Sequence, residues 1–375
     1  MSSPMFLGNP SELIASVPAV LSFTPTRSIV LLFGKPESPS GTSVSITFAA
    51  RANSPGDKNS LSDAELAHYA MDMCARLDAV AVVVVFVDDR LTPSGTSGTA
   101  DPRHRSVIDV LARHLESVNL VLGGAWAART LAPKAEWWDL LDAAQRGRLP
   151  DPDTSPVAVA YTAAGRTIHR SRSALADLVT TDTALRDRVA PLMLAAAVDT
   201  HRRWARAAQI GDLHADTRRT LWHVMHAITT WSPTESPDPQ MLAEVAVALR
   251  DRAIRDVMFG VAAGAHAARA EQLWSILTRA LPDPDRAQAA TLLAFHAYLR
   301  GDGPLAGIAL GAALSSDPKH LMARLLHAAL TYGMDPTRLH QLCRSGIEAA
   351  AELRIDIVAP QQHSHPKKGD RDTSR

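Results

Sequence analysis

Cysteine is scarce in this chain of 375 residues, which holds only Cys74 and Cys343. The two lie far apart, and neither has a second cysteine near it in the sequence, so a zinc knuckle or a CxxC redox pair is excluded. Both lie in apolar segments with helical periodicity. We therefore expect two buried free thiols in a protein that works in a reducing compartment.

An excess of charge of either sign is also missing. Lys and Arg together number 39, as do Asp and Glu, so the formal net charge is zero. Proteins that bind nucleic acids or anionic membranes usually carry a basic excess, so both partners are disfavoured. The longest uncharged apolar run, residues 79–87, is too short to span a bilayer. The N-terminus lacks the basic start of a signal peptide, and we expect a soluble, cytoplasmic protein.

Motifs that would identify a reaction are absent as well. The chain contains no G-x-G-x-x-G, G-x-x-x-x-G-K-[ST], G-x-S-x-G or H-E-x-x-H pattern. His223 and His226 have a spacing that a metal pair could use, but Trp222 and Met225 interleave with them, which favours a packed helix face. We predict no metal site and no cofactor, and whether the protein is an enzyme stays open.

The first part of the chain predicts an α/β domain over residues 1–180. Apolar, β-branched stretches alternate there with amphipathic helical stretches, an order typical of a sheet covered by helices. Residues 129–180 give no clear prediction. Strands are predicted at 28–34, 42–49, 80–87 and 119–128, and helices at 61–79 and 105–118.

Three details of this domain can be predicted. The link between residues 28–34 and 42–49 is short and polar, so these two strands are expected to pair antiparallel. Residues 80–87 have no polar face, which is typical of a central strand that is covered on both sides. Ser62 and Glu65, three residues apart, predict a capping box at the start of a helix.

The second part of the chain, residues 181–358, predicts an all-helical domain that includes one helix over 238–259. Four positions recur after 36 residues, with a small residue where paired helices cross and a proline at the end of each set. This pattern resembles the tetratricopeptide repeat and predicts repeat-like hairpins at about 253–333. Residues 359–375 are polar and are expected to be disordered. The recurring positions are Ala270, Trp274, Leu277 and Pro282, then Ala306, Leu310, Ala313 and Pro318.

A candidate ligand site lies where the predicted strands begin and end. Asp88 and Asp89 follow the strand with the most buried character, and in open α/β sheets ligands collect at the carboxyl ends of strands. Such a pair can hold Mg²⁺ or can simply face water. Arg27 and Ser28, in the turn before the first strand, complete the candidate site. Alternatively, Ser28 hydrogen-bonds the backbone of that turn.

The sequence also resembles a known family. The stretches "LIASVPAVLSFTPTRSIVLL" (13–32), "VVVVFVDD" (82–89) and "LLAFHAYLRGDGPLAGIALGAALSSDP" (292–318) are similar to segments of domain-of-unknown-function family 4192, in the same order. This is a bacterial family found mainly in high-GC Gram-positive lineages. It carries no assigned activity, so the resemblance implies a fold and a compartment but no mechanism.

Two functional hypotheses follow. In the first, the protein is a cytoplasmic interaction or regulatory protein, and its helical half presents a concave surface to a protein partner, as stacked hairpins do. In the second, it is an enzyme or a small-molecule or nucleotide-binding protein with a site near Asp88 and Asp89. The repeat pattern favours the first hypothesis.

Overall fold

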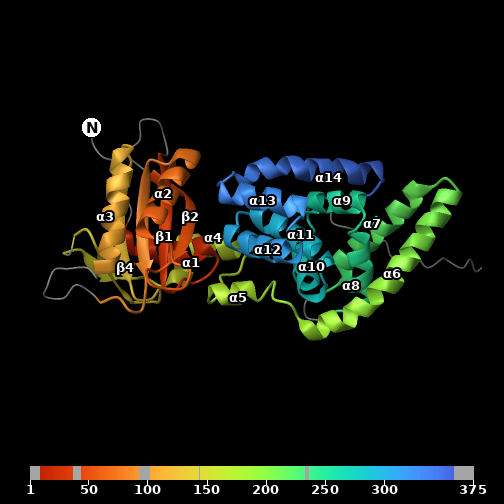
Figure 1. Ribbon diagram of the computed structural model, residues 1–375, viewed down its shortest axis with the longest axis horizontal. Helices are drawn as coiled ribbons and strands as arrows, with labels where there is room; N and C mark the ends of the chain where they lie inside the picture. The colour runs from red at the N-terminus through yellow and green to blue at the C-terminus, as the bar shows by residue number, and fades with distance from the viewer. Residues whose placement is uncertain (1–8, 37–43, 93–101, 143, 233–235, 359–375) are drawn as a thin grey trace, which may run out of the picture. The chain divides into compact units, whose positions relative to one another are not determined.

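The computed structural model describes residues 9–36, 44–92, 102–142, 144–232 and 236–358 (Figure 1). The chain divides into two compact units. Unit 1 comprises Met1–Thr180, Gly301–Leu310 and Leu321–Asp335, and unit 2 comprises Thr181–Arg300, Gly311–His320 and Pro336–Arg375. Unit 1 is therefore built from three separate stretches of sequence.

A mixed sheet of six strands forms the centre of unit 1, in the order β2-β1-β3-β4-β5-β6. Only β3 and β4 run parallel, and every other neighbouring pair is antiparallel. β2 is an edge strand, and β1 is its only partner among the described strands. The strands are β1 (Ser28–Pro36), β2 (Val44–Asn53), β3 (Ala81–Val87), β4 (Val121–Ala128), β5 (Glu136–Asp139) and β6 (Arg146–Arg148).

Both strand predictions for the first part of the sheet are confirmed. β1 pairs with β2 in antiparallel register, with Ser28 opposite Asn53. All seven residues of β3 are buried, because this strand lies between β1 and β4 and has helices or loops over both faces. A continuous run of valines suits this position, since branched side chains pack well on a pleated surface.

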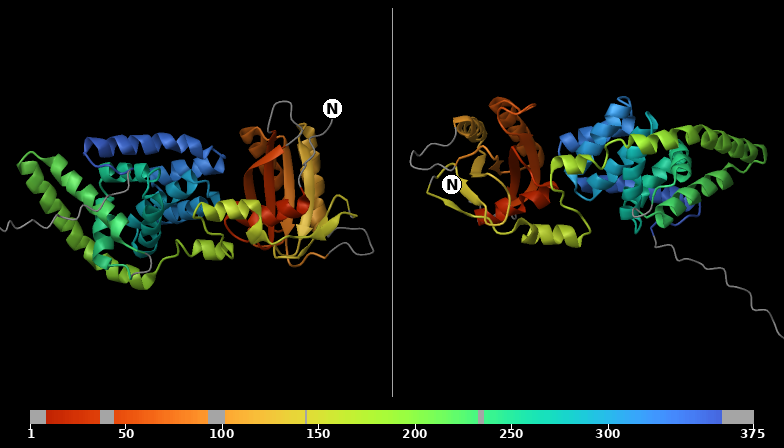
Figure 2. Two further views of the ribbon diagram at one scale, coloured as in Figure 1. Left: turned by 180° about the vertical axis from the view of Figure 1, so that it is seen from behind. Right: turned by 90° about the horizontal axis from the view of Figure 1, so that it is seen from below.

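Helices cover the two faces of this sheet. α2 (Asp63–Leu77) and α3 (Pro102–Ser117) lie together on one face, and α1 (Pro10–Leu21) lies on the other (Figure 2). The predicted capping box is present at the start of α2, where the Ser62 and Glu65 side chains each bond to the backbone of the other residue. The remaining helices of this part are η1 (Pro152–Thr154), α4 (Pro156–Ala163) and α5 (Arg172–Ala176).

The main core of unit 1 lies between the sheet and the α2–α3 pair. Leu31 and Phe86 from the sheet pack there against Met73 of α2 and Leu111 of α3. Each of these side chains is at most 1% exposed. Complete burial of one such side chain stabilises a fold by about 1.5–3 kcal/mol, so this layer fixes the position of β1 and with it the start of β2.

The rest of the chain is helical, as predicted, and contains no strand among the residues that the structure describes. The single helix expected over 238–259 is wrong, because two helices occupy this range. The Asp251 carboxylate accepts a hydrogen bond from the Ala253 N–H and caps a new helix there. The helices are α6 (Thr183–Gln209), α7 (Leu213–Thr230), α8 (Pro239–Ala248), α9 (Arg252–Val261), α10 (Ala267–Ala280), α11 (Asp285–Leu299), α12 (Gly303–Ser316), α13 (Leu321–Thr331), η2 (Pro336–Leu339) and α14 (His340–Glu352).

Both cysteines are buried free thiols, as expected. Burial raises the pKa of each thiol to about 11, so both are protonated at neutral pH. Within the described ranges, no helix is both long enough and apolar enough to cross a membrane. The segment expected to be disordered, residues 359–375, lies outside the described residues.

Candidate functional site

The four residues predicted from the sequence, Arg27, Ser28, Asp88 and Asp89, meet at one end of the sheet. Ser28 begins β1 and lies opposite Val87, the last residue of β3. Asp88 and Asp89 follow Val87 directly, and the Arg27 Nε atom lies 3.0 Å from Oδ1 of Asp89. We call these four residues the strand-end group.

Asp88 is fully buried and is held by the next arginine in the chain. The Arg90 Nε and Nη2 atoms donate to the two carboxylate oxygens of Asp88 at 2.8 and 2.6 Å. Burial on its own raises the pKa of Asp88, but the hydrogen bonds from Arg90 outweigh this and lower the pKa to about 2. Arg90 also pairs with Asp57 at 3.0 Å. A metal ion could reach the Asp88 carboxylate only by displacing a guanidinium.

Asp89 faces water and is also paired. Its carboxylate bonds to Arg27, and this hydrogen bond lowers the pKa of Asp89 and raises that of Arg27. Arg129 donates two hydrogen bonds to the Asp89 carbonyl oxygen. Exposed pairs of this kind contribute little to stability. Both carboxylates of the strand-end group therefore already have arginine partners.

Ser28 has the local role that the turn suggested, and a second one. Its hydroxyl donates to the Thr26 carbonyl oxygen at 2.7 Å. It also accepts a hydrogen bond from the Arg51 Nε atom at 2.8 Å. Ser28 therefore holds the side chain of Arg51, a residue of β2 that sequence reasoning did not single out. Arg51 also lines a pocket beside β2.

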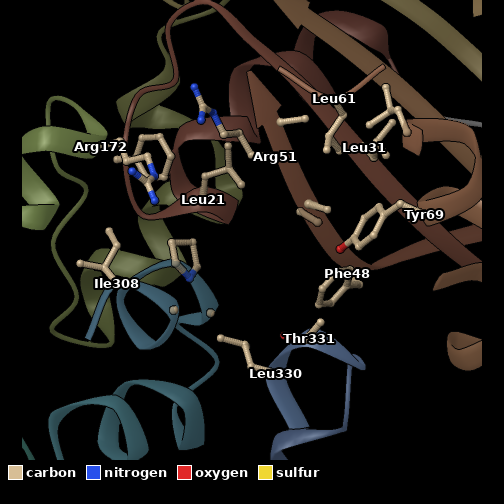
Figure 3. Close-up of a pocket in the computed structure, with 18 residues that line it drawn as sticks. Leu21, Leu31, Phe48, Arg51, Leu61, Tyr69, Arg172, Ile308, Leu330 and Thr331 are labelled. Carbon is tan, nitrogen blue, oxygen red and sulfur yellow. The ribbon is translucent and has the colours of Figure 1, made fainter. Parts of the chain in front are cut away.

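The pocket has a volume of about 440 Å³ and lies within unit 1 (Figure 3). Its walls come from β1, β2, α2, α5, the end of α1 with the chain that follows it, and the parts of α12 and α13 that belong to unit 1. Most of the lining is apolar, and the exceptions are Arg51, Arg172, Tyr69 and Thr331. The apolar lining residues are Leu21, Phe23, Leu31, Phe48, Ala49, Ala50, Ala52, Leu61, Leu66, Gly303, Pro304, Gly307, Ile308 and Leu330.

Arg51 and Arg172 lie next to each other on one side of the pocket, and Tyr69 directs its hydroxyl into the pocket from the other side (Figure 3). Neither arginine forms an ion pair with any carboxylate that the structure describes. Burial lowers the pKa of Arg51, and repulsion from Arg172 lowers it further, while Asp57 opposes both effects. The two guanidinium groups repel each other, so an anion placed between them would relieve that repulsion.

Sequence reasoning did not find this pocket because no motif marks it. The lining residues come from five or more segments between positions 21 and 331. Arg51 alternates with alanines in an ordinary strand pattern, and Arg172 is one of many arginines in the chain. One feature of the sequence could have indicated the pocket. In the stretch "FAARAN" (48–53), Arg51 is the single cation and three alanines surround it.

Comparison with known proteins identifies the family but no activity. Residues 10–337 match the family model described as a domain of unknown function, DUF4192, so the chain belongs to that family. Searches of curated proteins and of solved structures return no match.

Proposed function

We propose that this member of the DUF4192 family binds a small organic anion with an apolar body in the pocket of unit 1. The observation that carries the proposal is the pair Arg51 and Arg172, two cations without a described carboxylate partner at one side of an apolar pocket. A guanidinium in such a place is well suited to a carboxylate or a phosphate, because its N–H groups can bond two oxygens at once.

The size and lining of the pocket support the same ligand class. Small-molecule sites usually have volumes of about 300–1,000 Å³ and apolar walls with a few polar groups, and the volume here is about 440 Å³. A hydrogen bond to a charged group contributes about 1.5–3 kcal/mol. Leu21, Leu31 and Leu330 offer the apolar contact, and the arginines offer the charge.

A binding experiment with the full chain tests this function. Decanoate, octyl phosphate and phenylbutyrate are titrated by calorimetry, with octanol as the uncharged control. We expect the anions to bind and octanol to bind at least tenfold more weakly. Arg51→Gln and Arg172→Gln should each weaken anion binding at least tenfold, since the loss of one hydrogen bond to a charged group, about 1.5–3 kcal/mol, corresponds to a factor of ten or more.

Arg105→Gln is the matched control, because Arg105 is an exposed arginine of α3 and does not line the pocket. It should leave anion binding unchanged. If no anion binds the wild-type chain, or if the two pocket variants bind as tightly as Arg105→Gln, the proposal is wrong.

A second function, binding a protein partner through the helical half, is favoured by a separate observation. Leu194, Trp204, Ile210 and Trp222 of the α6–α7 region have relative exposures of 73%, 52%, 73% and 56%. Large apolar side chains that are exposed can mark an interaction site. The tetratricopeptide-like interpretation of the hairpins adds support, since Ala270, Trp274, Leu277, Ala306, Leu310 and Ala313 are all buried.

Site-specific photo-crosslinking in cells tests the partner hypothesis. A photoreactive residue is introduced at Trp204 or at Trp222, and at exposed Arg105 of unit 1 as the control. We expect the same discrete adduct from the first two positions and none from the third. Absence of any adduct specific to the two tryptophan positions would contradict this second function.

The strand-end group remains the alternative ligand site, with Asp88 and Asp89 as its carboxylates. A ligand or Mg²⁺ there has to compete with Arg90 and Arg27, so we rank this site below the pocket. Titration with Mg²⁺ tests it, and a midpoint shift that Asp89→Ala abolishes would reverse the ranking. The two free cysteines support a cytoplasmic location for either function.

A further inference from the structure

One wall of the pocket is the open edge of the sheet. β2 is the first strand in the order of the sheet, and among the strands that the structure describes it pairs only with β1. Five consecutive residues of this strand, Phe48 to Ala52, line the pocket. An edge strand presents a row of backbone donors and acceptors that can pair with another extended chain. The pocket therefore contains more hydrogen-bonding groups than its apolar side chains suggest.

The register shows which backbone groups face outward. The Ser54 N–H donates to the Arg27 carbonyl oxygen, so Arg27 and Ser54 form a hydrogen-bonded pair. Hydrogen-bonded pairs recur at every second residue of an antiparallel ladder, which assigns Ala52 and Ala50 to the bonds with β1. The N–H and C=O groups of Ala49 and Arg51 consequently point away from β1. No described backbone or side-chain group outside the strand bonds to them.

The side chains around these groups leave the backbone accessible. Ala49, Ala50 and Ala52 are the smallest chiral residues, and each is only partly buried. Side chains of a strand point towards the two faces of the sheet, so these methyl groups do not cover the outward N–H and C=O groups. The one long side chain, Arg51, is turned towards the Ser28 hydroxyl at 2.8 Å. The edge therefore combines an open backbone with a fixed cation.

We propose that the pocket ligand is a short peptide with a free carboxylate, which pairs in an extended conformation with the edge of β2. Two outward-facing residues, Ala49 and Arg51, match a paired segment of about three residues. The peptide carboxylate meets Arg51 and Arg172, and the apolar side chains of the peptide occupy the walls formed by α2, α12 and α13. This inference rests on the proposed function and narrows its ligand class. Backbone pairing supplies affinity and the pockets for alternate side chains supply selectivity, as in strand addition elsewhere.

The test uses the full chain and acetylated tripeptides that have apolar first and third residues. Each peptide is measured by calorimetry as the free acid, as the C-terminal amide, and with the backbone nitrogens of its first and third residues methylated, because these residues face Ala49 and Arg51. Decanoate serves as a non-peptide anion. We expect the free acid to bind at least tenfold more tightly than the amide or the methylated form. Arg51→Gln should lower the affinity for the free acid about tenfold.

Ala49→Pro tests the strand edge directly. Proline removes the outward N–H of Ala49 but no bond to β1, and an edge strand tolerates proline at such a position. Ala49→Val is the matched control, because it enlarges the side chain and retains the N–H. We expect at least tenfold weaker peptide binding in Ala49→Pro than in Ala49→Val. The decanoate affinity of Ala49→Pro should equal that of Ala49→Val and shows that the pocket is intact.

The possible outcomes separate the two proposals. If decanoate binds and no tripeptide does, the peptide assignment is wrong and the anion pocket stands. If tripeptides bind but neither N-methylation nor Ala49→Pro weakens them, strand pairing is wrong. If nothing binds, both proposals fail. Tight binding of the free acid with the losses described above supports both.

Discussion

Replacing Asp88 by asparagine should destabilise unit 1 by an amount that depends on pH. The Asp88 side chain is 0% exposed and accepts hydrogen bonds from Arg90 through both of its oxygens. Asparagine has nearly the same shape but no charge, and its amide nitrogen would face a guanidinium that also donates. The substitution therefore removes the ion pair with little change in packing.

The size of the effect follows from the pKa of Asp88, which falls from 3.8 to about 2 on folding. A difference of this size corresponds to roughly 2 kcal/mol of stability that requires the ionised carboxylate. Because the folded pKa is lower than the unfolded one, this contribution is complete above about pH 5 and is lost as the pH falls towards 2. About half of it should be gone at pH 3. Asp88→Asn should accordingly cost about 2 kcal/mol or more at pH 7, and clearly less at pH 3.

Hydrogen exchange measured by mass spectrometry on peptides from β1 and β3 provides the assay, because it reports the opening free energy of the sheet within the full chain. Asp89→Asn is the control, since Asp89 is exposed and its pair with Arg27 should contribute little to stability at any pH. An Asp88→Asn cost that is the same at pH 7 and pH 3, or no larger than that of Asp89→Asn, would refute the reasoning.

Three further predictions concern other parts of the molecule. Burial lowers the pKa of His296 from 6.5 to about 4, so acid favours unfolding. Stability should fall by about 2 kcal/mol between pH 7 and pH 5 in urea denaturation, and a His296→Asn variant with the same slope would contradict this. A Cβ atom at Gly346 would lie 2.6 Å from the Asp256 carbonyl oxygen, whereas one at Gly311 meets nothing within 4 Å. Gly346→Ala should therefore lower the thermal midpoint, and Gly311→Ala should raise it, because alanine has a helix propensity about 0.5–1 kcal/mol better than glycine. Midpoint shifts in the same direction for both variants would show that α9 and α14 can move apart to accept a Cβ atom at Gly346. Ser62→Ala removes a capping box and should cost about 1 kcal/mol by urea denaturation, and an unchanged unfolding midpoint would show that the box contributes little.

The sequence allowed the central part of the fold to be predicted, because the controlling interactions are local. The apolar run 80–87 and the capping box at Ser62 each depend on a few neighbouring residues, and both appear in the structure. β5 and β6 escaped prediction because they are only four and three residues long, too short for a period to develop. The break at Asp251 was hidden because apolar residues continue on both sides of it.

The candidate site was predictable only in part. That Ser28 and Asp88 lie at one end of the sheet follows from an antiparallel pairing of β1 with β3, which the sequence alone did not establish. The arginine partners of the two carboxylates depend on side-chain geometry. The sequence does not show this geometry, even though Arg90 directly follows Asp89. The pocket brings Arg51 together with Pro304 and Leu330, and no local pattern can show a contact across such sequence separations.

Because unit 1 is built from three separate stretches of sequence, it cannot be completed early in translation. The chain is made from its N-terminus, yet unit 1 includes residues up to Asp335. Until Asp302 emerges, the buried Ser22 hydroxyl lacks the carboxylate that it meets at 2.9 Å. The sheet can form early, but the walls of the pocket that contain Pro304 and Leu330 are added only after these residues have been translated. A nascent chain, or one that terminates before Pro304, would thus expose the edge of β2 without the complete pocket beside it, so ligand binding requires translation to proceed past Leu330.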